Sequence, residues 1–155
     1  MVLKLVLTRR GLRGILNQKS LGYKMDNQCK TYFSLRGDFD ANIVETPLGI
    51  KSYKKWNSKD KRMDGGEYGF SFICFGECLE YDAYAENQMR KSISKIKDKA
   101  ELIKKIVKKF NANLTLSVVP KVLSDSVLPS LSIPLDVIEF CSGVVAKIDI
   151  DLYVY

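Results

Sequence analysis

The stretch "YFSLRGDFDANIVETPLGI", Tyr32–Ile50, contains the change from strand to helix on which the predicted fold depends. Apolar and polar side chains alternate over residues 30–36, which predicts a strand with one buried face. Gly37 permits a sharp exit from the strand, Asp40 can cap a short helix, and Gly49 ends it. The Arg-Gly-Asp tripeptide in this stretch is therefore interpreted as a strand-to-helix junction and not as a cell-adhesion signal.

Four further segments have the features of strands. Aromatic residues on both faces of residues 68–75 indicate a central strand that is covered on both sides. The C-terminal segment is the clearest, because four apolar residues alternate there with acids, a lysine and tyrosines. The predicted strands are residues 30–36, 68–75, 114–119, 131–133 and 145–155.

A long helix is predicted over residues 89–110, where apolar residues recur at alternating spacings of four and three. Two more apolar residues widen this seam into the broad stripe of a helix that packs on a sheet. A coiled coil is the alternative, but Ala100 in the seam and the short length favour packing within the chain. A second short helix is expected between Pro134 and Gly143.

These elements indicate an α+β fold. One long and two short helices would pack on one face of a mostly antiparallel sheet of four to five strands. The other face would be partly open, and residues 51–69, too polar for a core, would form a long surface loop. The side chains expected on the open face are Lys30, Tyr32, Ser34, Arg36, Thr115, Ser117, Lys147, Asp149, Asp151 and Tyr153.

The net charge of +7 is concentrated in two segments. Residues 1–24 contain six Lys or Arg and no acid, and residues 86–110 contain nine Lys or Arg against three acids. We expect residues 1–24 to be a basic N-terminal extension, with translation starting at Met25, and residues 25–155 to form a single domain. An organellar transit peptide and an added edge strand over the alternating residues 3–7 stay open as alternatives.

Several classes of chemistry are disfavoured by composition. The chain has no histidine, which removes Ser-His and Cys-His nucleophile pairs and the usual proton shuttle near neutral pH. It has no Gly-rich phosphate loop and no apolar run near the roughly 18 residues that cross a bilayer. We therefore expect no cofactor, no metal ion, no membrane partner and no catalytic residues.

The four cysteines are expected to be buried, reduced thiols in the cytoplasm. They do not have the two-residue spacing of zinc knuckles, so a four-thiolate metal site is the weaker alternative. The cysteines are Cys29, Cys74, Cys78 and Cys141.

The run from Tyr32 to Trp56 resembles the opening of the bacterial domain of unknown function family 4279. Members of that family show a strand, then Gly-Asp-Phe-Asp, a short helix ending in Leu-Gly, and a Trp a few residues later. The "LTLSVV" segment and the terminal "IDIDLYVY" are similar as well, so the resemblance covers about residues 29–155. The family's usual Pro after the helix is missing here. The resemblance implies an α+β cytoplasmic bacterial domain and no particular activity.

The sequence favours a non-enzymatic cytoplasmic protein that binds another protein, such as an immunity-type toxin inhibitor. An open polar sheet face and an aromatic, charged loop would supply the binding surface. The identity of the partner is not indicated, and a homodimer stays open. The residues expected to bind the partner are Tyr32, Arg36, Tyr53, Trp56, Asp149 and Asp151.

Nucleic-acid binding is the alternative function, through the basic leader and the Lys-rich helix. Lys predominates over Arg there, and no aromatic residues are interleaved for base stacking, which favours a solvated helix face. An enzyme that relies on carboxylates ranks last. The residues expected to contact nucleic acid are Arg90, Lys91, Lys95, Lys104 and Lys108.

Overall fold

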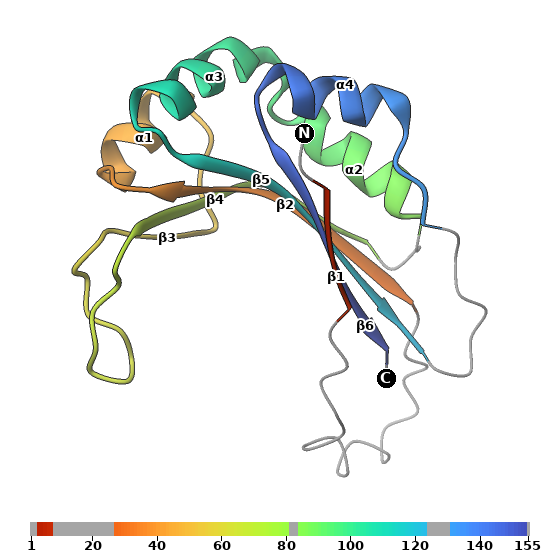
Figure 1. Ribbon diagram of the computed structural model, residues 1–155, viewed down its shortest axis with the longest axis horizontal. Coiled ribbons are helices and arrows are strands. Elements are labelled where there is room, and N and C mark those ends of the chain that lie inside the picture. The colour runs from red at the N-terminus through yellow and green to blue at the C-terminus, as the bar shows by residue number, and fades with distance from the viewer. Residues whose placement is uncertain (1–2, 8–26, 81–83, 124–130, 155) are drawn as a thin grey trace.

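The computed structural model describes residues 3–7 as a strand and residues 27–80, 84–123 and 131–154 (Figure 1). Six strands form one sheet in the order β1-β6-β5-β2-β4-β3. The strands are β1 (Leu3–Leu7), β2 (Gln28–Gly37), β3 (Lys54–Trp56), β4 (Ser71–Glu80), β5 (Asn113–Val122) and β6 (Lys147–Val154). The helices are α1 (Ala41–Leu48), α2 (Ala85–Ser94), the 3-10 turn η1 (Lys97–Lys99), α3 (Ala100–Lys109) and α4 (Leu135–Gly143).

The predicted α+β fold with a mostly antiparallel sheet is confirmed. Strand β2 pairs antiparallel with both β4 and β5, and β3 pairs antiparallel with β4. Strand β6 runs parallel to β5, because α4 carries the chain back across the sheet between them. Strand β1 extends the sheet beyond β6, also in parallel orientation. The edge-strand alternative for residues 3–7 is thus observed.

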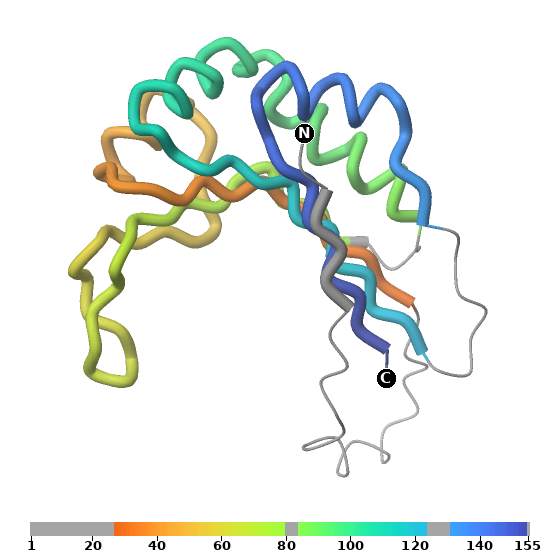
Figure 2. Tube along the Cα trace, viewed as in Figure 1, coloured from red at the N-terminus to blue at the C-terminus, as the bar shows by residue number. Residues whose placement is uncertain are grey.

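All described helices lie on one side of a strongly curved sheet (Figure 1). The core fills the space between these two layers. Phe33 and Leu116 from the sheet and Met89 from α2 are completely buried there. The sheet curves away from the helices, so its concave side, which is the open face, carries no described helix (Figure 2).

The predicted long helix is divided in two, and a single helix over residues 89–110 is therefore wrong. Helix α2 ends at Ser94, and the turn η1 separates it from α3. Ile96, just before the turn, is completely buried, while η1 itself has no buried residue. The break lets both halves of the apolar seam follow the curved sheet, which one straight helix could not do (Figure 1).

Residues 131–133 belong to no strand, contrary to prediction. This segment lies beside the helix layer, because the Ser132 hydroxyl donates a hydrogen bond to the Glu86 carboxylate on α2. Ile133 packs against the core. Ile133 therefore anchors the start of α4 and does not belong to an additional strand.

Three predicted boundaries also differ from the structure. The expected loop over 51–69 contains β3 and an isolated bridge between Lys61 and Glu67. Strand β4 begins at residue 71 and not 68. The C-terminal strand begins two residues later than predicted, because Val145 has a left-handed φ of 59° that no strand residue adopts.

The junction after β2 forms as predicted. Asp40 Oδ1 accepts a hydrogen bond of 2.8 Å from the Asn42 amide, and Gly49 ends α1 with a φ of 61°. The reason for a glycine at position 37 differs from the expected one, which was a sharp exit from the strand. A Cβ at this position would lie 3.1 Å from the Ala112 Cβ, so glycine is needed for close packing.

Candidate protein-binding face

The ten side chains expected on the open face of the sheet alternate with core residues and lie opposite the helices. Register places Tyr32, Ser117 and Asp149 side by side across β2, β5 and β6. Arg36 and Lys147 are exposed, Ser34 is buried, and the other seven are half-buried. The sequence therefore predicted the membership of this face correctly but overestimated how open its centre is.

Trp56 is packed within its own hairpin. Its ring lies between Tyr68 and Phe72, with centroids 4.5 Å and 4.3 Å away and nearly parallel planes. The indole Nε1 is buried and has no hydrogen-bond partner among the described residues. Trp56 therefore stabilises a stack of aromatic rings at the candidate site, which we call the aromatic platform. Its indole N–H remains an unused hydrogen-bond donor.

Two cations rest on this aromatic platform. The Arg36 guanidinium lies 3.6 Å from the centroid of Phe70, and Lys54 Nζ lies 5.3 Å from that of Trp56. Both residues are exposed. Within the described ranges neither forms an ion pair with an acid, so their charge is available to a partner. We call Arg36, Lys54, Trp56, Phe70 and Phe72 the cationic-aromatic patch.

Tyr32 and Tyr53 form a second aromatic pair next to the patch, edge to face at 5.8 Å. Lys30 Nζ lies 4.7 Å from the Tyr53 ring and forms an ion pair with Glu77. Burial raises the pKa of Tyr32 above its usual value, and burial together with a hydrogen bond to Cys74 raises the pKa of Tyr53. Both phenols are therefore neutral at physiological pH.

Asp149 and Asp151 lie at the other end of the face, on β6. Asp151 accepts a hydrogen bond of 2.7 Å from the Tyr153 hydroxyl. Asp149 Oδ1 is buried and has no hydrogen-bond partner among the described residues. In the part of the chain that the structure describes, no three His, Cys, Asp or Glu side chains converge as metal ligands.

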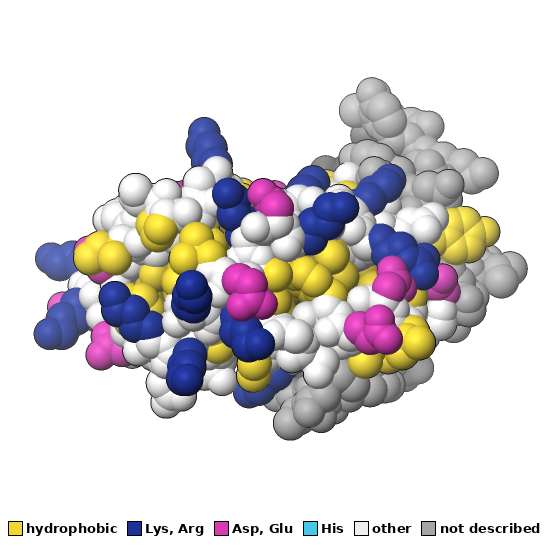
Figure 3. Space-filling view, turned by 90° about the horizontal axis from the view of Figure 1, so that it is seen from above, with side chains coloured by type: hydrophobic (Ala, Val, Ile, Leu, Met, Phe, Trp, Pro, Cys, Tyr) yellow, Lys and Arg dark blue, Asp and Glu magenta, His cyan; other side chains and the backbone are white. Residues whose placement is uncertain are grey.

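The basic residues of the nucleic-acid alternative do not form one continuous surface. Arg90 on α2 is held by Asp136, with Nε–Oδ2 at 2.8 Å and Nη2–Oδ1 at 3.1 Å, and this pairing raises the pKa of the guanidinium. Lys95 Nζ donates to the Glu77 carbonyl. The turn η1 divides Lys91 and Lys95 from Lys104 and Lys108. On the helical side, cations are scattered among acids and apolar side chains (Figure 3).

Lys104 and Lys108 instead border a shallow groove of about 450 Å³ between the end of α3 and the sheet. Lys147 lies at the same groove and donates a hydrogen bond of 3.3 Å to Asn113 Oδ1. No acid lines it. Cations near a helix C-terminus are also favoured by the helix dipole, which accounts for part of this arrangement.

All four cysteines are buried free thiols, as predicted. Burial raises the pKa of both Cys29 and Cys141 to about 12. Cys78 Sγ donates a hydrogen bond of 2.7 Å to Gln88 Oε1. The four thiols are therefore core side chains.

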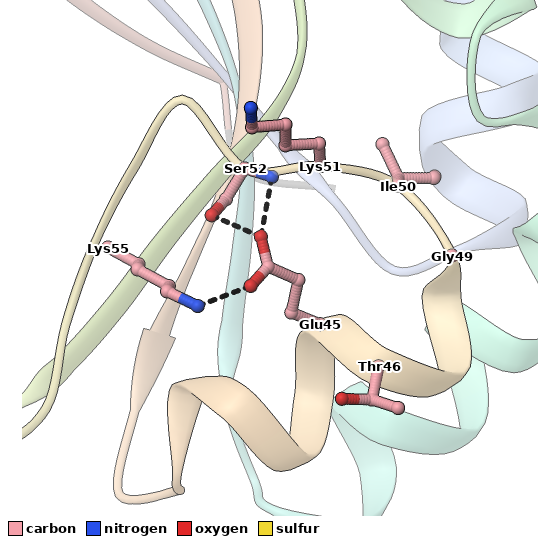
Figure 4. A pocket seen from close by; sticks show the side chains of 7 residues that line it. All are labelled: Glu45, Thr46, Gly49, Ile50, Lys51, Ser52 and Lys55. Carbon is pink, nitrogen blue, oxygen red and sulfur yellow. Dashed lines mark hydrogen bonds and ion pairs between the residues drawn. The ribbon is translucent and has the colours of Figure 1, made fainter.

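Sequence analysis did not predict the cluster of polar contacts that Ser52 and Lys55 make with Glu45, which we call the Glu45 clamp. Its carboxylate accepts hydrogen bonds from the Ser52 amide at 2.7 Å and the Ser52 hydroxyl, and it pairs with Lys55 (Figure 4). These donors lower the pKa of Glu45 to about 2. An open depression of about 400 Å³ lies beside the clamp. No periodicity connects these residues, because a helix and the following loop bring them together.

The fold defines a class of small α+β domain in which helices cover one face of a curved sheet and leave the other to the solvent or to a partner. The family model for a domain of unknown function, DUF4279, matches residues 27–155, and the chain belongs to this family. No curated protein matches the chain. No solved structure matches it either. No helix in the described ranges is long and apolar enough to span a bilayer.

Proposed function

We propose that this protein binds another protein, without catalysis, through the open, concave face of its sheet. We further propose that the partner presents an acidic surface. The observation that carries the proposal is the cationic-aromatic patch. Arg36 lies 3.6 Å from Phe70 and is exposed, and no acid in the described ranges neutralises it. Arg, Trp and Tyr are the residue types that dominate binding energy at protein interfaces.

Charge complementarity determines the kind of partner. Carboxylates on a partner would pair with Arg36 and Lys54, which the aromatic rings beneath already hold in place. A pre-positioned guanidinium loses little entropy when it binds a carboxylate. The acidic end of the face, at Asp149 and Asp151, would repel an acidic partner and so fix its orientation.

Inhibition of a toxin is a form of binding that such a face can perform. An inhibitor that blocks an active site needs shape and charge complementarity and no chemistry of its own. The chain provides no histidine, and its cysteines are buried and free. Free thiols also support a reducing compartment such as the cytoplasm.

The test is capture of the partner by the tagged full chain, with a matched pair of variants. Arg36→Glu/Lys54→Glu reverses the patch, and Lys97→Glu/Lys105→Glu makes the same change in net charge on the helical side. The partner must be acidic, must bind the helical-side variant as it binds the wild type, and must bind the patch variant at least tenfold more weakly by calorimetry. Equal binding to both variants, or capture of no protein that distinguishes them, would overturn the proposal.

Nucleic-acid binding remains a second candidate because of the acid-free groove at Lys104, Lys108 and Lys147. It predicts that fluorescence anisotropy detects binding of a labelled duplex at low salt and that binding weakens steeply as salt rises. The variant Lys104→Glu/Lys108→Glu would abolish that signal, while Arg36→Glu/Lys54→Glu would not.

A further inference from the structure

The acid-free groove between the end of α3 and the sheet gathers positive charge from two segments that are far apart in the chain. Lys104 and Lys108 come from α3, and Lys147 begins β6. All three side chains are exposed, and among the described residues none of them forms an ion pair. Three like charges around one space repel each other, so the arrangement costs free energy unless an anion occupies that space.

The helix ends at this groove do not account for all three cations. At the end of α3 the Val107 carbonyl already accepts a backbone hydrogen bond of 3.0 Å from the Ala112 amide. The dipole effect is confined to the last turn of a helix, and Lys104 lies before that turn. Helix α4 also ends at the groove, because Val145 lines it. Two helix ends contribute roughly −1 elementary charge against three full positive charges, so the groove stays positive.

The remaining lining residues supply hydrogen-bond donors and an apolar floor. Lys147 Nζ donates to Asn113 Oδ1 at 3.3 Å, which leaves the amide N–H groups of Asn113 as donors. Val107 and Leu114 are buried beneath the groove. A volume of about 450 Å³ is within the range of sites that bind small molecules. Charge of one sign, a few amide donors and an apolar floor together suit a small organic anion.

Val145, on the rim of the groove, has a conformation that the fold by itself disfavours. Its φ is 59°, which a β-branched residue rarely adopts. Its side chain is 63% exposed, so burial in the core does not offset the strain. Glycine is the usual residue at such a helix end. The exposed apolar side chain is instead placed to contact the organic part of an anion that the lysines hold.

We propose that this groove binds a small organic diphosphate, with the phosphate oxygens at Lys104, Lys108 and Lys147 and the organic part against Val145. A diphosphate ester carries roughly three negative charges near neutral pH, which matches the three ammonium groups. Lysine binds phosphate as a point charge and does not need the bidentate geometry of arginine.

The observations favour a small molecule over a nucleic acid at this groove. The basic residues of α2 are separated from those of α3 by the turn η1, so no continuous cationic track extends from the groove along the helices. The inference also goes beyond the proposed function, because no residue of the cationic-aromatic patch lines the groove.

The test is calorimetry on the full chain at low salt with five probes. Inorganic pyrophosphate, ADP and dimethylallyl diphosphate carry the diphosphate group, and AMP and sulfate are the controls. We expect ADP or dimethylallyl diphosphate to bind at least tenfold more tightly than either control. The tighter of the two shows whether the organic part is a nucleoside or a hydrocarbon.

Matched variants locate the binding. Lys104→Glu/Lys147→Glu should weaken binding of the tighter diphosphate at least tenfold. Lys97→Glu/Lys105→Glu makes the same change in net charge outside the groove and should bind it as the wild type does. The patch variant Arg36→Glu/Lys54→Glu should also bind it as the wild type does.

Val145→Gly separates a ligand contact from a purely structural role. Relief of the strained φ should raise the urea midpoint of the unliganded chain. Loss of the side chain should weaken binding of the organic diphosphate at least threefold and leave binding of inorganic pyrophosphate unchanged. A higher midpoint with unchanged affinity for both probes would contradict the placement of the organic part at Val145.

The other outcomes are equally decisive. Absence of binding, sulfate that binds as tightly as the diphosphates, or equal weakening by the two lysine variants would each overturn the proposal. A labelled duplex that binds more tightly than the diphosphates at the same salt would also overturn it and assign the groove to nucleic acid. If Lys104→Glu/Lys147→Glu does not fold, as judged by circular dichroism, Lys104→Gln/Lys147→Gln must meet the same criterion. Since the patch variant is titrated alongside, failure here and failure of the proposed function are distinguishable.

Discussion

Thr31 on β2 and Ser92 on α2 meet in the core, with their hydroxyl oxygens 2.6 Å apart. Thr31 Oγ1 also donates to the Gln88 carbonyl at 2.9 Å, so Ser92 is the donor to Thr31. Both hydroxyl-bearing residues are completely buried. A polar link therefore joins the central strand to the helix that covers it, in the middle of an apolar interface.

Replacing one member of this pair should destabilise the fold. Thr31→Val keeps the shape and leaves both the Ser92 hydroxyl and the Gln88 carbonyl without that contact, which costs about 1–3 kcal/mol. Urea unfolding monitored by circular dichroism measures the change. The double variant Thr31→Val/Ser92→Ala should cost less than the sum of the single changes, and strict additivity would show that the two hydroxyls are independent.

Gly37 provides a test of close packing. Gly37→Ala would place a Cβ 3.1 Å from the Ala112 Cβ and 3.2 Å from its Cα, so the backbone must shift. We expect a loss of about 1–3 kcal/mol in the free energy of unfolding. Gly69→Ala is the matched control, because nothing lies within 4 Å of the added Cβ. Equal unfolding midpoints for the two variants would contradict the packing argument.

The single Trp reports on the hairpin platform. Because Trp56 lies between Tyr68 and Phe72, its fluorescence emission should be blue-shifted in the native state. Tyr68→Ala should shift the emission to the red and lower stability by about 1–3 kcal/mol through lost ring stacking and burial. Tyr84→Ala, at an exposed tyrosine on the helical side, should leave the emission spectrum unchanged. A red-shifted wild-type spectrum would place Trp56 in the solvent.

The Glu45 clamp predicts a pH dependence of stability. The pKa of Glu45 falls from the model-compound value of 4.5 to about 2 in the folded chain. A lowered folded pKa means that the stabilisation is complete above pH 4.5 and is lost as the pH falls toward 2. Between these limits the wild type should lose stability more steeply than Glu45→Gln in urea titrations. Glu101→Gln, at an exposed helix position, is the control and should follow the wild type.

The burial of the cysteines predicts that their thiols are alkylated slowly in the native chain. With the pKa of Cys29 and Cys141 at about 12, alkylation of the native chain by iodoacetamide at pH 8 should be negligible at these positions. Mass spectrometry after a timed pulse measures it, and unfolding in denaturant should expose all four sites. Rapid native labelling of Cys29 would show that the strand opens.

The sequence alone was sufficient to predict those features of the fold that depend on residues close together in the chain. Alternation from Lys30 to Arg36 predicted the face of each residue on β2, because strand periodicity is a property of the backbone. The cap at Asp40 and the left-handed glycine at position 49 depend on contacts a few residues apart. The family motifs from Tyr32 to Trp56 consist of such junctions, and family membership follows from their order.

Contacts between distant segments decided the rest. The heptad pattern over 89–110 indicated which residues are buried but not the break at η1, which depends on the curvature of the sheet beneath. The packing of Trp56 within its hairpin, the Glu45 clamp and the register of Lys4 opposite Asp149 each join segments that no local period connects. The sequence determined the periodicities, the caps and the absence of histidine chemistry. Tertiary structure decided which charges remain unpaired and which edge of the sheet is covered, because those properties depend on the packing of residues that are far apart in the chain.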